Sequence, residues 1–201
     1  MISAIVLAAG ESKRMGAENK LLLPFDGKPL IEHIVCTVQA SNVDEVIVVV
    51  GHEAERVQAA LAGCGVYIVQ NDHYREGMTT SIHAGVFAAA AETEGFMICL
   101  SDLPLIEPEE LNLLIGAFKQ ALAEDSAAIA VPVYEGQRGN PVLFAAQYRS
   151  DILNHKGLMG CKGIVKQNPN HVVRVEMPTD HILHDIDTKD DYRLWGRGKG
   201  Q

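Results

Sequence analysis

The fold is decided by residues 2–20, which read ISAIVLAAGESKRMGAENK. The first eight, Ile2–Ala9, form a near-continuous apolar run, and a polar loop that contains glycines follows up to Lys20. A run of this length fits a strand that is buried on both faces. It is shorter than the ~18 residues of a membrane helix and no basic leader precedes it. We therefore interpret it as a buried strand and not as a signal peptide.

The rest of the chain alternates between apolar runs of strand length and stretches with helical spacing. Helices are predicted over residues 29–40, 53–62, 79–91 and 107–123, and strands over 46–50, 66–70, 96–100, 127–133 and 141–144. Continuous apolar strands separated by helices are typical of a mostly parallel sheet covered on both faces. The sequence thus predicts a three-layer α/β fold with right-handed crossovers. After Val133 the alternation loosens, and we expect this irregular part to frame a pocket.

Composition narrows the class of function. The chain has 201 residues, 47% of them hydrophobic, and 17 basic residues against 26 acidic ones give a net charge of −9. This length favours one domain, and the apolar fraction excludes global disorder. The acidic balance argues against nucleic-acid and anionic-membrane partners. The four cysteines include no close CxxC pair and require no disulfide, which favours a reducing, cytoplasmic location and argues against a zinc cluster.

The loop after the first strand has the chemistry of a phosphate site. Gly10 and Gly16 let backbone N–H groups approach an anion, Ser12 adds a hydroxyl, and Arg14 and Lys20 add positive charge. In an α/β sheet, ligands bind at the carboxyl ends of the strands, where this loop lies. The spacing fits neither the P-loop nor the G-x-G-x-x-G fingerprint. We interpret it as a phosphate loop of another kind, the alternative being a solvated surface loop.

The string Leu-Ala-Ala-Gly-x-Ser-x-Arg-Met-Gly-x-x-x-Lys resembles the signature of the MobA-like nucleotidyltransferases, most closely the molybdenum cofactor cytidylyltransferases and the accessory proteins of molybdenum hydroxylases. The resemblance implies a Rossmann-like nucleotide-diphospho-sugar transferase fold in one domain, 1–201, with a nucleotide-binding part over 1–105 and an acceptor-side part over 130–190. It also implies that the loop wraps a nucleoside triphosphate. The GTP-using branch has Leu-Ala-Gly-Gly here, so Ala9 favours CTP. The implied nucleotide contacts in this loop are Leu7, Ala8, Ala9, Gly10, Ser12, Arg14 and Lys20.

A second segment resembles the family's nucleoside pocket. It consists of Asn71 and the stretch Gly77-Met78-Thr79-Thr80-Ser81. The resemblance makes Asn71, Gly77 and Ser81 candidate nucleotide contacts. A purely structural alternative is that Thr79 or Thr80 caps the following helix.

Two aspartates are candidate metal ligands. Asp102 ends a buried strand beside Pro104, where a carboxylate suits a hard cation. Asp187 lies in a stretch that resembles the family's Asp-Ile-Asp-Thr-x-x-Asp-Tyr motif, and the resemblance implies that both aspartates hold Mg²⁺ or Mn²⁺. Thr188 is predicted to cap a helix, and Asp190 and Asp191 are predicted to lie at the N-terminus of this helix, where negative charge is favourable. A zinc site at His181 and His184 is a weaker alternative, because an extended chain would place these two histidines on opposite faces.

The acceptor side carries the clearest departures from the family. The resemblance implies an acceptor pocket around Pro104, Asn140, Pro141 and Lys162. Where the family has Gly-Asp-x-Gly-Ala-Arg, this chain has Cys161 in place of the acid and Val165 in place of the arginine. Lys162 and Lys166 are candidate replacements for the lost positive charge.

These features together predict a Mg²⁺- or Mn²⁺-dependent transfer of CMP from CTP to a phosphorylated acceptor such as molybdopterin. Arg14, Lys20 and Asp102 would carry catalysis by positioning and charge neutralisation, and molybdenum hydroxylase maturation proteins are possible partners. Three alternatives stay open: another donor or acceptor, such as GTP or a sugar phosphate; a nucleotide-binding accessory protein without turnover; and a metal-dependent hydrolase that uses the His181 and His184 region.

Overall fold

The first strand lies at the centre of the sheet. In the computed structural model, which describes residues 1–16, 18–157 and 160–195, β1 (Ile2–Ala8) pairs in parallel with β4 (Glu45–Val50) and with β6 (Gly95–Leu100). Six of its seven residues are buried, and Ile5 lies opposite Ile47 on one side and Ile98 on the other. An apolar strand with covered faces and two parallel neighbours is what its sequence predicts.

The sheet order is β10-β7-β9-β6-β1-β4-β5. The remaining strands are β5 (Tyr67–Gln70), β7 (Ile129–Tyr134), β8 (Gln137–Arg138), β9 (Val142–Ala145) and β10 (Val172–Glu176). β9 runs antiparallel to both β6 and β7, and β8 pairs only with β7. The connection from β7 to β9 is too short for a crossover helix, so it returns as a hairpin. A short separate hairpin joins β2 (Pro24–Phe25) and β3 (Lys28–Pro29).

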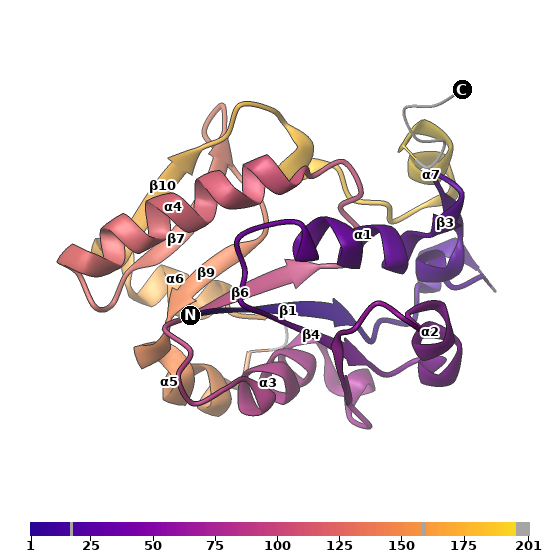
Figure 1. The fold of residues 1–201 in the computed structure, drawn as a ribbon, viewed down its shortest axis with the longest axis horizontal. Coiled ribbons are helices and arrows are strands. Elements are labelled where there is room, and N and C mark those ends of the chain that lie inside the picture. The colour runs from indigo at the N-terminus through magenta and orange to yellow at the C-terminus, as the bar shows by residue number, and fades with distance from the viewer. Residues whose placement is uncertain (17, 158–159, 196–201) are drawn as a thin grey trace.

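Helices cover both faces of this sheet, as the sequence predicts. Figure 1 shows α1 and α4 on one side of the sheet and α3 and α5 on the other. The bounds of the α-helices are α1 Leu30–Gln39, α2 Ala54–Ala60, α3 Met78–Ala88, α4 Pro108–Glu124, α5 Arg149–Asn154, α6 Lys162–Gln167 and α7 Lys189–Trp195. The described part of the chain contains no helix that is both long enough and apolar enough to cross a bilayer. The three-layer α/β class is thus confirmed.

The contact between α3 and the sheet leaves no room for a side chain at Gly85. A Cβ at this position would overlap Ile5 and would lie 3.1 Å from Cγ2 of Val49. We expect Gly85→Ala to lower the free energy of unfolding by about 1–3 kcal/mol through overpacking. Gly116→Ala in α4 is the matched control, since nothing lies within 4 Å of its Cβ position and alanine favours a helix by about 0.5–1 kcal/mol. Urea unfolding measures both, and equal stability of the two variants would contradict this packing.

Candidate nucleotide and metal site

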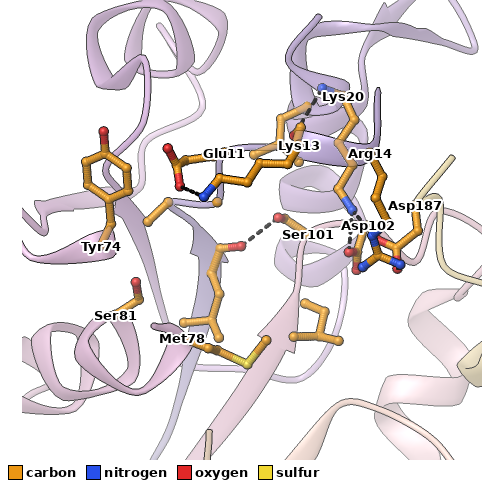
Figure 2. A pocket seen from close by; sticks show the side chains of 16 residues that line it. Glu11, Lys13, Arg14, Lys20, Tyr74, Met78, Ser81, Ser101, Asp102 and Asp187 are labelled. Carbon is orange, nitrogen blue, oxygen red and sulfur yellow. Dashed lines mark hydrogen bonds and ion pairs between the residues drawn. The ribbon is translucent and has the colours of Figure 1, made fainter. Parts of the chain in front are cut away.

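A cavity of about 420 Å³ opens at the carboxyl ends of β1 and β6. Figure 2 shows the loop after β1 on one side of it and Asp102 and Asp187 close together on another. Nine residues predicted from the sequence line it: Leu7, Ala9, Gly10, Ser12, Arg14, Lys20, Ser81, Asp102 and Asp187. Ala8, Asn71 and Gly77 are not among its lining residues. The neighbouring strands β1 and β6 thus bring the glycine loop and Asp102 to one place, as the position of ligands in α/β sheets leads us to expect.

The loop that follows β1 and ends at Lys20, called the glycine loop below, is held by hydrogen bonds among its own residues. Ser12 has a left-handed conformation, with φ 50°, and its carbonyl accepts the N–H of Met15 at 2.8 Å. The Ser12 hydroxyl accepts the N–H of Lys20 at 3.4 Å, and the buried Asn19 accepts the N–H of Leu21 at 3.1 Å. Met15 is buried beneath the loop. These contacts fix both ends of the segment that carries Arg14 and Lys20.

The two cations of this loop lie on carboxylates. Lys20 Nζ is 2.7 Å from Asp102 Oδ2 and 2.9 Å from Asp187 Oδ1, and Arg14 is 2.7 Å from Asp187 Oδ2 (Figure 2). Burial opposes the charge on Lys20, but the two carboxylates outweigh it and raise the pKa of its ammonium group. Burial likewise opposes the charge on Asp187, yet Lys20 and Arg14 hold the pKa of its carboxyl below its ordinary value. Both shifts favour the charged forms of Lys20 and Asp187.

A third carboxylate completes a group that suits a divalent cation. Asp102, Asp185 and Asp187 each offer one oxygen, and these atoms lie within 4.8 Å of one another. Asp102 Oδ1 is buried without a hydrogen-bond partner, which leaves one lone pair available to a ligand. Burial, with Asp187 and Asp102 close by, raises the pKa of Asp185. Mg²⁺ and Mn²⁺ prefer oxygen ligands, and carboxylates are common among them. The three aspartates therefore fit such an ion.

Sequence reasoning missed Asp185. The Asp-Ile-Asp alternation carried the signal, because Ile186 is fully buried and its N–H donates to the carbonyl of Asp102 at 2.8 Å. That bond ties the segment to the end of β6. With the residue between them turned inward, Asp185 and Asp187 each present a carboxylate oxygen to that of Asp102. Asp187 lines the cavity, and Asp185 is exposed.

The predicted nucleoside pocket has a structural framework of its own. The amide nitrogen of Asn71 donates to Thr80 Oγ1 at 2.9 Å and to Ser81 Oγ at 3.0 Å, and its oxygen accepts the N–H of His73. Asn71 thereby orients Ser81, which faces the cavity. The expectation that Thr79 or Thr80 caps α3 is wrong. The helix begins at Met78 after Gly77, whose φ of 117° is accessible to glycine, and the side chain of Thr80 bonds back to the Gly77 carbonyl.

A second cavity, of about 460 Å³, adjoins the first. Met78 and Leu100 line both cavities. Of the four predicted acceptor residues, Asn140 and Lys162 line this cavity. Pro141 lines a narrow cleft beside Ile34, and Pro104 lines a third cavity, where its carbonyl lies 3.0 Å from His33 Nε2. The structure therefore brings only two of the four acceptor residues together.

Comparison with known proteins agrees with this arrangement. Residues 4–172 match the MobA-like NTP transferase domain. The chain belongs to this family. The bifunctional protein GlmU of Listeria monocytogenes serotype 4a is 37% identical over 141 residues, which cover 68% of this chain and 29% of the relative. The chain therefore spans less than a third of the length of this curated relative.

Solved structures share the fold over nearly the whole chain. A nucleotidyl transferase from Methanothermobacter thermautotroptrophicus has a TM-score of 0.80 at 29% identity and covers 97% of this chain and 96% of its own. A Mycobacterium tuberculosis H37Rv protein solved as a complex with manganese has a TM-score of 0.75 at 24% identity, with 97% of each chain covered. The second likeness shows the fold alone.

The two departures from the MobA-like pattern lie in the wall of the second cavity. Cys161 and Val165 both line it, and both are buried. Burial raises the pKa of the Cys161 thiol to about 12. The thiol is therefore protonated at neutral pH and unsuited to act as a nucleophile or metal ligand, which favours a plain substitution.

The segment after Asp180 is not extended at its start. His181–Leu183 form a 3-10 helix, so the expected period of two is wrong there. His181 Nδ1 is 2.9 Å from Glu110 Oε2, and His184 Nε2 is 2.8 Å from Asp180 Oδ2. The group of potential metal ligands found in the described part of the chain contains neither histidine.

The predicted cap of the last helix is confirmed. Thr188 Oγ1 accepts the N–H of Asp191 at 3.2 Å, and Asp191 Oδ2 accepts the N–H of Thr188 at 2.7 Å. This reciprocal pair satisfies backbone donors at the start of α7. It also fixes the chain directly after Asp187.

A buried glutamate anchors the segment that carries the metal candidates. Glu110 in α4 is 4% exposed. Its carboxylate accepts the N–H of Glu107 at 2.8 Å and the hydroxyl of Thr179 at 2.5 Å, besides its contact with His181. These bonds join the start of α4 to residues 179–181, six residues before Asp187. The position of Asp185 and Asp187 thus depends on Glu110, which no motif in the sequence marks.

We expect Glu110→Ala to lower the free energy of unfolding by about 1–3 kcal/mol, because it leaves three part-buried groups, on Glu107, Thr179 and His181, without their carboxylate partner. It should also weaken Mn²⁺ binding, since the segment before Asp185 loses its anchor. Glu109→Ala, an exposed neighbour on the same helix, is the control and should change neither quantity. Thermal unfolding and Mn²⁺ titration measure the two effects. Unchanged Mn²⁺ affinity in a folded Glu110→Ala protein would contradict the anchoring role.

Proposed function

We propose that this chain transfers a nucleotidyl group from a nucleoside triphosphate to a phosphorylated acceptor, with Mg²⁺ or Mn²⁺. One observation carries the proposal: Asp102, Asp187, Arg14 and Lys20 line a cavity that adjoins a second cavity, and the carboxylate of Asp185 lies beside those of Asp102 and Asp187. Such a pair of spaces fits a donor and an acceptor. The family to which the chain belongs supports the same class of reaction.

The chemistry needs no strong base. An oxygen of the acceptor phosphate forms a bond to the α-phosphorus, the bond from that phosphorus to the bridging oxygen breaks, and pyrophosphate leaves with the electron pair. A phosphate nucleophile is already ionised near neutral pH. What the protein must supply is alignment and neutralisation of charge on the phosphates.

The cluster of three aspartates, Lys20 and Arg14 would supply both, if the two cations exchange the carboxylates for the phosphates. Asp102, Asp185 and Asp187 would hold the divalent ion, which supplies charge neutralisation on the phosphate oxygens when bound. Lys20 and Arg14, which now contact the carboxylates, would then turn to the triphosphate. The negative charge of Asp102, Asp185 and Asp187 would thus serve to bind the metal ion of a nucleotide site. Leu7, Ala9, Gly10, Ser12 and Ser81 remain the proposed nucleotide contacts of the cavity wall.

The finer proposal is that the donor is CTP and the acceptor is molybdopterin, with molybdenum hydroxylase maturation proteins as partners. The glycine-loop motif and Ala9 support it, through their resemblance to the cytidylyltransferase branch. The division into a nucleotide part, 1–105, and an acceptor part, 130–190, belongs to the same proposal. A sugar phosphate is the second candidate acceptor.

Pyrophosphate release separates these possibilities. Each of the four nucleoside triphosphates is incubated with Mg²⁺, with and without molybdopterin or a sugar phosphate, glucose 1-phosphate. We expect release with CTP only when molybdopterin is present. Pyrophosphate release with the sugar phosphate would make the sugar phosphate, and not molybdopterin, the acceptor. Pyrophosphate release without any acceptor would indicate a hydrolase. Nucleotide binding without release under every condition would overturn transferase activity in favour of an accessory role.

A further inference from the structure

The floor of the second cavity is apolar. Five side chains in its wall, contributed by β6, α3, β9 and the α6 region, are each exposed by 7% or less: Ile82, Ile98, Phe144, Cys161 and Val165. β6 and β9 are paired here, with Ile98 opposite Val142, which also lines the cavity. An apolar group of a ligand that packs against this surface leaves water, and this transfer favours binding.

Few neutral polar groups are free in this wall. The N–H of Gly139 donates to the carbonyl of Pro132 at 3.0 Å, and the N–H of Gly160 donates to Thr79 Oγ1 at 3.2 Å. Asn140 is the one uncharged amide side chain among the described lining residues, and none of these residues is an aspartate or glutamate. A sugar ring presents hydroxyl groups on all sides, and each requires a partner when it leaves water. The uncharged side chains of this wall, Asn140 apart, supply no such partners.

Three cations surround the floor. Arg138, Lys162 and Lys166 line the cavity, and all three side chains are exposed. None of them forms an ion pair with any residue that the structure describes, although the chain carries 26 acidic residues. Lys162 and Lys166 are one turn apart in α6, a spacing at which like charges destabilise a helix. Unpaired positive charge at the mouth of an apolar cavity fits an anion with an apolar body.

We propose that the acceptor is an amphipathic phosphate ester, whose apolar ring or hydrocarbon body packs against Ile98, Phe144 and Val165. Arg138, Lys162 and Lys166 hold its phosphate beside the first cavity. This rests on the proposed function, because the second cavity is taken to be the acceptor site. It selects against sugar phosphates, which carry the same charged group on a hydroxylated body.

Two probes of equal charge test the proposal: 1-naphthyl phosphate and glucose 1-phosphate. Calorimetric titration into the full chain with CTP absent should give a dissociation constant at least about tenfold lower for the naphthyl ester. The double variant Lys162→Ala/Lys166→Ala should weaken naphthyl phosphate binding about tenfold and leave binding of CTP with Mg²⁺ unchanged. Lys119→Ala, an exposed lysine on α4, is the matched control. Val142→Thr, which adds a hydroxyl to the wall at nearly constant shape, should narrow the preference between the two probes.

The outcomes separate this proposal from the transferase activity. Equal or tighter binding of glucose 1-phosphate would overturn the amphipathic acceptor, as would naphthyl phosphate binding that the lysine double variant leaves intact. Preferential naphthyl phosphate binding without pyrophosphate release from any acceptor would uphold the cavity's selectivity and overturn the transferase. Pyrophosphate release with glucose 1-phosphate, together with no binding of the naphthyl ester, would uphold the transferase and overturn the cavity's selectivity.

Discussion

We expect Asp102→Asn to abolish nucleotidyl transfer and to leave the fold intact. Asn keeps the size of the side chain but removes the negative charge that contacts Lys20. It also replaces one of the two acceptor oxygens with an NH2 group, so it cannot both accept from Lys20 and offer an oxygen at the position of the unpartnered Oδ1. We expect pyrophosphate release to fall about a thousandfold or more, because charge neutralisation on the reacting phosphates is the largest contribution that such a site makes. Circular dichroism should be unchanged, and Mn²⁺ affinity should fall at least about tenfold.

Asp151→Asn is the control for this variant. Asp151 is exposed on α5 and lines none of the cavities described above, so its loss of charge should not affect transfer. Turnover of Asp102→Asn within a few-fold of the wild type, with a metal ion still required, would remove Asp102 from the site. A loss shared by both variants would point to net charge and not to the carboxylate.

Lys20→Met separates catalysis from metal binding, because it should move them in opposite directions. Lys20 Nζ occupies the space between Asp102 and Asp187, so its removal frees two carboxylates for a cation. We expect Mn²⁺ to bind at least as tightly as in the wild type, measured by electron paramagnetic resonance. Transfer should nevertheless fall about 10²–10³-fold, since one positioned charge on the phosphates is lost.

Lys28→Met provides the comparison for Lys20. Lys28 is exposed and pairs with Glu32 away from the cavity, so both Mn²⁺ binding and transfer should stay at the wild-type level. Weaker Mn²⁺ binding in Lys20→Met, together with normal turnover, would mean that Lys20 organises the carboxylates and does not contact the nucleotide.

The sequence predicts the central part of the fold because burial leaves a clear pattern there. β1, β4 and β6 are apolar except at Ser3 and Glu45, and the predicted strands agree with the observed ones to within a residue. The direction of β9 is not encoded in that pattern, since an apolar strand looks the same in either orientation. It follows from the short return through β8, which pairs with the end of β7.

The candidate site was predictable where a motif carried it. Gly10, Arg14, Lys20, Asp102 and Asp187 meet in one cavity, as residues at the ends of parallel strands should. The contacts among them were not predictable, because a sequence does not show that Lys20 and Arg14 turn to carboxylates before a phosphate is present. Asp185 was missed for a similar reason: its place beside Asp102 accompanies the burial of Ile186 and the bond from the Ile186 N–H to the carbonyl of Asp102, and a sequence shows neither.

The central claim is tested most directly by anomalous diffraction from crystals of the protein with CTP and Mn²⁺. The account predicts a manganese peak within coordination distance of Asp102, Asp185 and Asp187, with the triphosphate along residues 10–20 and in contact with Arg14 and Lys20. A peak at His181 and His184, or a nucleotide bound away from the glycine loop, would contradict it.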